Sequence, residues 1–308
     1  MEEKSKEFVE KGAEVYAKVR GIHVELPAAL FKYCPPERVD ILEGLKIRFS
    51  QPAVFNDIFE CLPGTNQATD FQAAFQNFAV GTQAQIASHP EWDRKTRRAY
   101  EREEARKFEK WCKAEKSKGH HERLCEEVQL RSSSVMGILC LSGKWDNVLM
   151  WSHYTRDHQG FVIEFVGDNP FFGRGVAKVN YSNERPILSN RRDGWNDGAL
   201  FETKSKDWEY EDEYRKFEYF GKTRSLPNGN TLVEFPESKD IDSKNWPLRL
   251  IDVPPDSIRK IILGYRIAAE PKLKILDALK DPKLKHVLCS QALPHRNQFR
   301  MEEVPVKR

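Results

Sequence analysis

The chain has 308 residues, with 50 lysine and arginine residues against 47 aspartate and glutamate residues. A net charge this close to zero does not by itself indicate a nucleic-acid or membrane-surface partner, and no stretch approaches the roughly 18 apolar residues of a membrane helix. The highly charged start of the chain lacks the apolar region of a signal peptide, and the six cysteines form no CxxC pair. We therefore expect a soluble, cytoplasmic globular protein with reduced thiols and no membrane partner.

Local patterns predict four elements near the start of the chain. Residues 1–26 suggest a polar helix that precedes the main domain, and Ala28–Tyr33 suggests a short strand. Pro36–Leu42 is predicted as a helix because it begins with proline and ends at Gly44, the usual asymmetry of helix ends. Leu45–Phe49 alternates apolar with basic residues, which predicts a strand with one buried face.

A helical insertion is predicted at about residues 66–131. Phe71, Phe75 and Phe78 recur at helical spacing, and charges of both signs dominate from residue 91 to residue 131. Mixed charge along a helix is usually a solvated face. We therefore expect long surface helices here, inserted into the rest of the domain.

The second half of the chain is predicted to supply most of the sheet. The near-continuous apolar run Val135–Leu141 predicts a central buried strand, and Asn147–Tyr154 predicts a short helix. Further strands are predicted at Phe161–Phe165, Val176–Tyr181, Ile258–Leu263 and within 286–306, with a helix at Glu270–Leu279 and loops at Asp193–Gly198 and most of Ser225–Trp246. Residues 27–308 are thus predicted to form one α+β domain, a mixed and mainly antiparallel sheet with flanking helices.

The segment Trp151-Ser152-His153-Tyr154 is the first candidate site. It combines aromatic surface, hydrogen-bond donors and a histidine that titrates near neutrality, just before the apolar strand that carries Glu164. His153 is therefore a candidate acid or base, or else a structural histidine. We expect Trp151 to pack in the core. Glu164 faces either a cleft or, more commonly for such strands, solvent.

The acidic segment 208–215 is the second candidate site. It places four acids between residues 209 and 213, near Lys204 and Arg215. If the segment is extended, Glu211 and Glu213 point the same way and form a carboxylate pair that can orient a sugar hydroxyl and stabilise a cationic transition state. If it is helical, the acids are solvated and Glu211 pairs with Arg215. The spacing leaves both interpretations open, and residues 208–220 fit neither period cleanly.

Several other chemistries find little support. The cysteines and histidines at 112, 120, 121 and 125 match no compact zinc spacing, so we expect no metal site. The chain also lacks a Walker A loop, a Gly-x-Gly-x-x-Gly motif and a Gly-x-Ser-x-Gly elbow. P-loop hydrolysis, Rossmann dehydrogenase chemistry and α/β-hydrolase chemistry are therefore not indicated.

An ordered set of motifs resembles a bacterial family of unknown function, over roughly residues 28–290. The landmarks are Leu30-Phe31-Lys32-Tyr33, Phe49-Ser50, Phe55-Asn56-Asp57, Trp151-Ser152-His153-Tyr154, Gly160, Glu164-Phe165, Thr203-Lys204-Ser205, Trp208, Glu211, Glu213, Arg215 and Ile261-Ile262-Leu263-Gly264. This resemblance implies a fold of mixed α and β structure and no particular activity. Among the landmarks, the candidates for substrate contacts are Lys32, Tyr33, Ser50, Asn56, Asp57, Tyr154, Glu164, Lys204, Trp208 and Arg215.

The order of elements and motifs is also similar to that of ADP-ribosyltransferases. These enzymes use three residues in chain order. The first is a cationic residue or histidine on one strand, the second is a hydroxyl-bearing or aromatic residue on a second strand, and the third is a glutamate nearer the end of the chain. Lys32 or Tyr33 stands at the first position, Ser50 at the second, and Glu213 or Glu211 at the third. The similarity implies NAD as substrate, a glutamate on the ribose 2′-hydroxyl, aromatic stacking by Tyr33, Tyr154 or Trp208, and a toxin or phage-defence effector as the biological role.

The competing hypothesis is a non-catalytic module that binds nucleic acid or a protein in a bacterial defence system. It would use the basic cluster of the insertion, formed by Arg94, Lys95, Arg97 and Arg98. The mixed charge of the insertion favours the enzyme hypothesis slightly. The catalytic candidates are therefore Glu213, Glu211 and His153, with a small-molecule nucleotide as the expected ligand and an unspecified macromolecular acceptor.

Overall fold

The computed structural model describes residues 24–64, 67–115, 120–187, 199–225, 231–234, 236 and 240–307. The helix predicted for residues 1–26 falls outside this part of the chain except for its last three residues, which are not helical. The loop predicted at 193–198 also lies outside the described residues.

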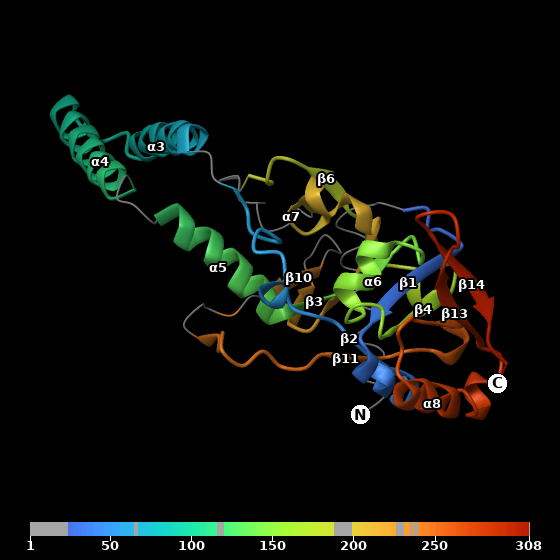
Figure 1. Cartoon of the computed structure of the whole chain (residues 1–308). Coiled ribbons are helices and arrows are strands. Elements are labelled where there is room, and N and C mark those ends of the chain that lie inside the picture. Colours follow the sequence, from blue (N-terminus) through green and yellow to red (C-terminus); the bar gives the residue numbers. More distant parts are fainter. Residues whose placement is uncertain are drawn as a thin grey trace.

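An eight-stranded sheet forms the body of the protein (Figure 1). Its order is β14-β13-β12-β4-β1-β3-β8-β5, and the neighbours are antiparallel except for the parallel pair β12 and β13. The strands are β1 (Ala29–Cys34), β3 (Met136–Ser142), β4 (Phe161–Val166), β5 (Val176–Lys178), β8 (Glu213–Tyr219), β12 (Ile258–Leu263), β13 (Leu288–Pro294) and β14 (Met301–Pro305). The predicted α+β class with a mainly antiparallel sheet is therefore confirmed.

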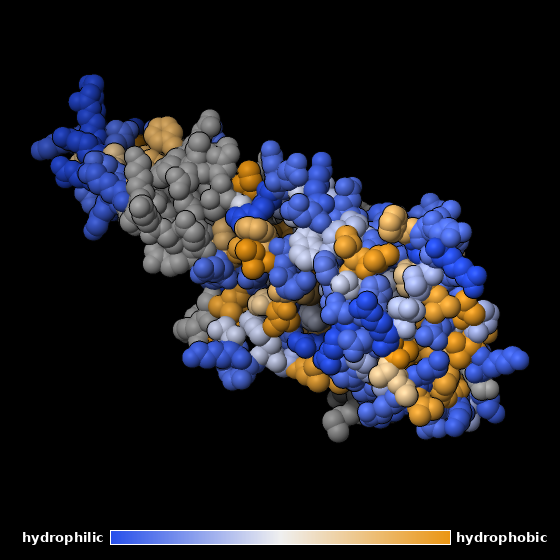
Figure 2. All heavy atoms as spheres, in the orientation of Figure 1, coloured by the Kyte–Doolittle hydropathy of each residue, from blue (hydrophilic) through white to orange (hydrophobic). Residues whose placement is uncertain are grey.

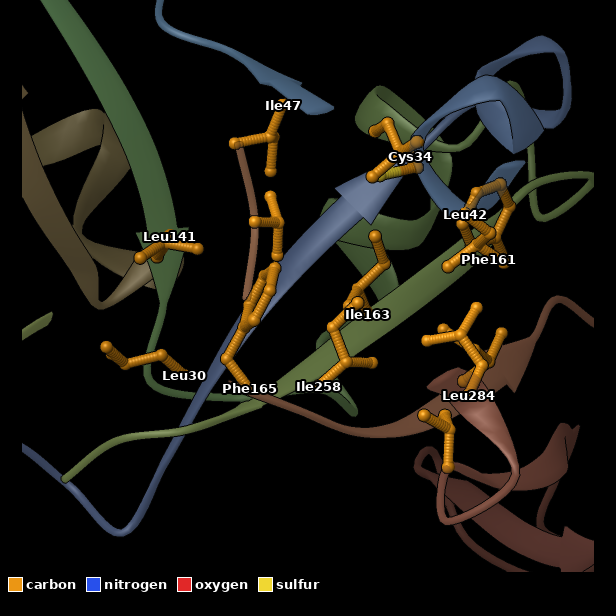
Figure 3. Packing of buried hydrophobic residues seen from close by; sticks show 14 of the residues in the cluster. Leu30, Cys34, Leu42, Ile47, Leu141, Phe161, Ile163, Phe165, Ile258 and Leu284 are labelled. Carbon is orange, nitrogen blue, oxygen red and sulfur yellow. The ribbon is translucent and has the colours of Figure 1, made fainter. Parts of the chain in front are cut away.

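Side-chain alternation along the central strands gives the sheet two buried faces. On β1, Leu30 and Cys34 enter one apolar cluster, while Phe31 and Tyr33 enter another. The first cluster, drawn in Figure 3, packs the sheet against α2 (Asp40–Gly44) and α8 (Ala269–Ala278). The second packs it against α6 (Val148–Tyr154). Because both faces are covered, the central strands are almost continuously apolar.

The predicted insertion is helical. Its helices are α3 (Gln67–Ala87), α4 (Arg94–Glu115) and α5 (His120–Val135). α3 and α4 extend away from the sheet, and α5 leads back into β3 (Figure 1). Phe78 stacks on Phe108 at 4.7 Å between ring centroids, which explains the helical spacing of aromatics in α3. The visible surface of α4 is strongly hydrophilic (Figure 2). No helix in the described residues is long and apolar enough to cross a membrane.

Smaller elements connect these layers. Short strands pair as β2 (Lys46–Arg48) with β11 (Leu250–Asp252), β6 (Asn180–Ser182) with β7 (Thr203–Ser205), and β9 (Lys222–Ser225) with β10 (Thr231–Glu234). Short helices lie at η1 (Pro36–Val39), η2 (Pro52–Val54), η3 (Pro170–Phe172), α7 (Ala199–Glu202), η5 (Lys206–Glu211), η7 (Pro255–Ser257) and η8 (Pro282–Leu284).

One sequence prediction needs correction. The single strand predicted over 176–181 is two strands, because β5 pairs with β8 in the large sheet whereas β6 leaves it and pairs with β7. Within the stretch 225–246, which was predicted to be mostly loop, Thr231–Glu234 forms the short strand β10, and it pairs antiparallel with β9. Strand pairing, which local patterns do not report, stabilises this short segment.

Candidate functional site

The candidate site lies where β1 and β3 part. The two strands are paired only through Phe31 and Ser142. Farther along β3, the backbone of Ser50 takes the place of β1 and exchanges two hydrogen bonds with Ile138, of 2.9 and 2.8 Å. The Lys32 ammonium lies between these points and donates to the carbonyl of Cys140 at 3.0 Å. A cavity of about 380 Å³ opens at this position.

Most of the sequence-predicted site residues line this cavity. They are Lys32, Tyr33, Ser50, Asn56, His153, Tyr154, Lys204, Glu211 and Glu213. They come from β1, from the loop after β2, from α6 and from the stretch that runs from β7 through η5 to the start of β8. The two dense sequence clusters therefore meet in one cavity, although about 50 residues separate them in the chain.

A buried network of charges forms one wall of the cavity. Lys204 Nζ lies 2.5 Å from Glu211 Oε2, 3.3 Å from Glu213 Oε2 and 3.8 Å from Glu60 Oε2. Arg215 donates Nε to Glu213 Oε1 at 2.9 Å and Nη2 to Glu213 Oε2 at 3.0 Å, and Nη2 also contacts Glu60. These side chains are at most 4% exposed. Three carboxylates against two cations leave one net negative charge when all are ionised.

The local backbone brings Glu211 and Glu213 together in a way that neither sequence alternative anticipated. Glu211 ends the short 3-10 helix η5, and Glu213 begins β8. Asp212 between them is left-handed, with φ 45° and ψ 55°, a conformation that aspartate tolerates better than most residues. Both glutamates are buried. The helical alternative with solvated acids is therefore wrong, and a continuous strand is not formed either.

Burial and charge set the protonation of this wall. Burial raises the pKa of Glu213 above its ordinary value, although Lys204 opposes the shift. Burial also disfavours the Lys204 ammonium, but the carboxylates of Glu213 and Glu211 outweigh it and raise the pKa of Lys204. For Tyr154, burial and the charge of Glu211 raise the pKa, so the phenol keeps its proton and donates to Glu211 Oε1 at 2.5 Å. The wall therefore holds a charged lysine beside one carboxyl group, that of Glu213, whose pKa is raised.

Aromatic rings surround the mouth of the cavity. His153 is exposed, and its Nδ1 lies 2.9 Å from the hydroxyl of Tyr210. The ring of Trp208 lies 6.4 Å from that of His153, and its face is 4.8 Å from the Lys204 ammonium. Trp208 does not line the cavity itself, but it covers the lysine that does. The rim offers flat surfaces on which a planar ligand group can stack.

Besides Trp208, three predicted site residues, Asp57, Glu164 and Arg215, do not line the cavity, and Trp151 lies in the core. Trp151 is fully buried, meets Tyr33 edge to face at 5.5 Å and donates to the carbonyl of Trp145, as expected of a core residue. Glu164 is buried too, but it pairs with Lys260 at 3.0 Å and with Arg259 at 3.3 Å, away from the cavity. The solvent-facing alternative for Glu164 is wrong, because these two cations from β12 cover it.

The other two displaced residues flank the charged wall. Asp57 lines a neighbouring cavity of about 280 Å³ that shares Glu60 and Lys204 with the first. Arg215 is fully buried behind Glu213 and does not reach the cavity. Sequence analysis missed Glu60, which lies in a turn three residues after the Phe55-Asn56-Asp57 landmark. Its closeness in the sequence to that landmark is the signal by which Glu60 could have been found.

Comparisons with known proteins give this chain no relative. No family model matches it, and neither a curated protein nor a solved structure is significantly similar to it. Within the described residues, no group of three or more histidine, cysteine, aspartate or glutamate side chains is arranged to hold a metal ion. The function must therefore be argued from the cavity itself.

Proposed function

We propose that the cavity binds NAD and that the protein cleaves the bond between nicotinamide and ribose, transferring ADP-ribose to an acceptor. The observation that carries this proposal is the convergence of Lys32, Ser50, Tyr154, Glu211 and Glu213 on one cavity of about 380 Å³. A volume of this size suits a compact group such as the nicotinamide and its ribose.

The carboxylates of the wall favour such a ligand. The nicotinamide ring of NAD is cationic, and the ribose gains positive charge at its anomeric carbon as the bond breaks. A preorganised carboxylate in a place that excludes water stabilises this charge more in the transition state than in the ground state. Glu60, Glu211 and Glu213 line the cavity with Lys32 and Lys204, and Arg215 lies behind Glu213, so the six charges balance and the stabilisation would come from the carboxylate nearest the ribose.

The two glutamates are suited to different tasks. Glu213 receives two guanidinium bonds from Arg215 and a third contact from Lys204, so its charge is largely compensated. Glu211 accepts one bond from Tyr154 and one from Lys204, and its oxygens keep free lone pairs toward the cavity. Glu211 is therefore the better acceptor for a ribose hydroxyl, and Glu213 positions the cations around it.

The proposed step is balanced without any further reagent. The bond between the anomeric carbon and the pyridinium nitrogen breaks, and its electron pair leaves with nicotinamide. The acceptor supplies a lone pair to the anomeric carbon and loses a proton, which Glu211 or His153 takes up. Both groups line the cavity, and His153 stands at its exposed mouth. Tyr154 lines the cavity and offers aromatic surface to the leaving ring.

Release of nicotinamide from NAD tests the proposal. The purified wild-type protein is incubated with NAD, with and without a cell lysate as a source of acceptors, and nicotinamide is quantified by chromatography. We expect Glu211→Gln to lower the rate about 100- to 1,000-fold, the usual effect of removing one preorganised electrostatic contact. Glu209→Gln is the matched control, because Glu209 lies in the same segment but is exposed. No release by the wild type, or an equal rate in Glu211→Gln, would overturn the proposal.

A further inference from the structure

A second, larger groove lies on the other side of α6 from the candidate site. Its volume is about 700 Å³, and it is formed by the turn after α6, the start of the β12–α8 connection and the tip of the β13–β14 hairpin. Val148 and His158 bound this groove, whereas His153 and Tyr154 line the first cavity. The segment that contains α6 thus separates the two.

Among the described residues that line the groove, every charged side chain is basic. Arg266, Arg296 and Arg300 line it, all three exposed, and so do His158 and His295. No aspartate or glutamate is among the described residues that line it. None of the three arginines forms an ion pair with a carboxylate in the part of the chain that the structure describes. A protein with a nearly balanced total charge therefore concentrates cations at this place.

Two exposed aromatic rings accompany the arginines. Tyr265 is 48% exposed, and Phe299, at the hairpin tip, is fully exposed. Both line the groove. Single exposed apolar side chains are common on protein surfaces, but apolar side chains grouped at one place mark interaction sites, and these two rings share one groove. Arginines that contact phosphates, interleaved with aromatic rings that stack on bases, form the usual platform for single-stranded nucleic acid.

The backbone around the groove is held in an uncommon conformation. Arg156, Asp157 and His158 are three consecutive non-glycine residues with positive φ, of 51°, 55° and 66°. Such strain persists where the surrounding structure enforces it, and it collects at functional sites. The carbonyl of His158 accepts the backbone N–H of Arg266, and this bond joins two walls of the groove.

We infer that this groove binds single-stranded nucleic acid. Arg266, Arg296 and Arg300 contact the phosphates, and Tyr265 and Phe299 stack on unpaired bases. The arginines alone would also suit a phosphorylated peptide, but such a ligand has no use for two exposed rings at the same place. Duplexes are disfavoured because their bases are already stacked on one another. This inference is independent of the proposed reaction with NAD.

The binding is measured by fluorescence anisotropy with labelled oligothymidylate, which has no secondary structure of its own. The logarithm of the binding constant should fall with the logarithm of the salt concentration, with a slope of about −2 or steeper for three phosphate contacts. The variant with Arg266→Ala, Arg296→Ala and Arg300→Ala should lose this slope. Phe299→Ala and Tyr265→Ala should each weaken binding roughly 5- to 100-fold at every salt concentration.

The insertion offers a matched control. Arg94→Ala, Lys95→Ala and Arg98→Ala together remove three exposed cations from α4, and they should leave binding unchanged. The inference is overturned if oligothymidylate does not bind at low salt, or if the α4 variant loses as much affinity as the groove variant. It is also overturned if a duplex or a doubly phosphorylated peptide binds more tightly than the single strand.

Discussion

Replacing each of the two central glutamates with glutamine should separate their roles. Glu213 provides both acceptors for the fork of Arg215, at 2.9 and 3.0 Å, and Arg215 is fully buried. A glutamine has one oxygen and one amide NH₂, so an N–H of Arg215 or Lys204 would face another donor. Breaking a buried ion pair from one side costs about 3–5 kcal/mol. We expect Glu213→Gln to lower the free energy of unfolding by about that amount.

Glu211→Gln should be tolerated by the fold. The carbonyl oxygen of the new side chain can still accept from Lys204, and its NH₂ can donate to the hydroxyl oxygen of Tyr154, which reverses the existing bond. Lys204 keeps Glu213 and Glu60 as neighbours. The expected loss is therefore about 1.5–3 kcal/mol, the usual value of a hydrogen bond to a charged group, and smaller than that for Glu213→Gln.

Urea unfolding followed by tryptophan fluorescence measures both variants against the wild type. The account predicts a large shift of the midpoint for Glu213→Gln and a smaller one for Glu211→Gln. Equal shifts, or a larger shift for Glu211→Gln, would refute the division of roles between a positioning glutamate and a substrate-binding one. Circular dichroism of the folded proteins checks that the starting states are comparable.

Three further predictions concern the fold around the site. Gly160→Ala should lower the free energy of unfolding by at least about 2 kcal/mol, because a Cβ there would overlap the carbonyl oxygen of Cys34. Asn147→Ala should cost about 1–2 kcal/mol, because this side chain caps the first turn of α6. For Glu218→Gln, the free energy of unfolding of the variant minus that of the wild type should increase as pH rises above about 4.5. Burial raises the pKa of Glu218, so the folded wild type keeps a proton that the unfolded chain has lost, and its stability falls over that window.

Each of these predictions has a measurement that can contradict it. Gly44→Ala is the control for Gly160, since nothing lies within 4 Å of its added Cβ, and equal destabilisation of the two would disprove the steric argument. Asn147→Asp keeps the capping oxygen, so a loss equal to that of alanine would show that capping is not the cause. For Glu218, urea unfolding at a series of pH values gives the difference between variant and wild type. A difference that stays constant or falls with pH would contradict the assigned shift.

Local sequence patterns predicted the elements that periodicity and chain breakers control. The alternation in Leu45–Phe49, the apolar run Val135–Leu141 and the capped helix Asn147–Tyr154 all correspond to real elements. Patterns of this kind report which face of an element is buried, so they also placed Trp151 in the core. They contain no information about which strands pair, and the order of the eight strands could not be derived from them.

The candidate site was predicted as a set of residues but not as a geometry. Its carboxylates are close because Asp212 adopts a left-handed conformation between η5 and β8, and neither a helical nor an extended period describes that junction. Glu60 escaped notice because it lies in a turn without periodicity. Glu164 looked like a solvated residue because its partners Arg259 and Lys260 come from a strand almost a hundred residues later.

A crystal structure of the Glu211→Gln variant soaked with NAD would test the central claim most directly, because this variant should bind the substrate without cleaving it. The account predicts the nicotinamide ring in the cavity between β1 and β3, with a ribose hydroxyl against residue 211 and an aromatic ring of the rim beside the pyridinium. NAD bound elsewhere on the protein, or a cavity that stays empty at saturating NAD, would contradict it.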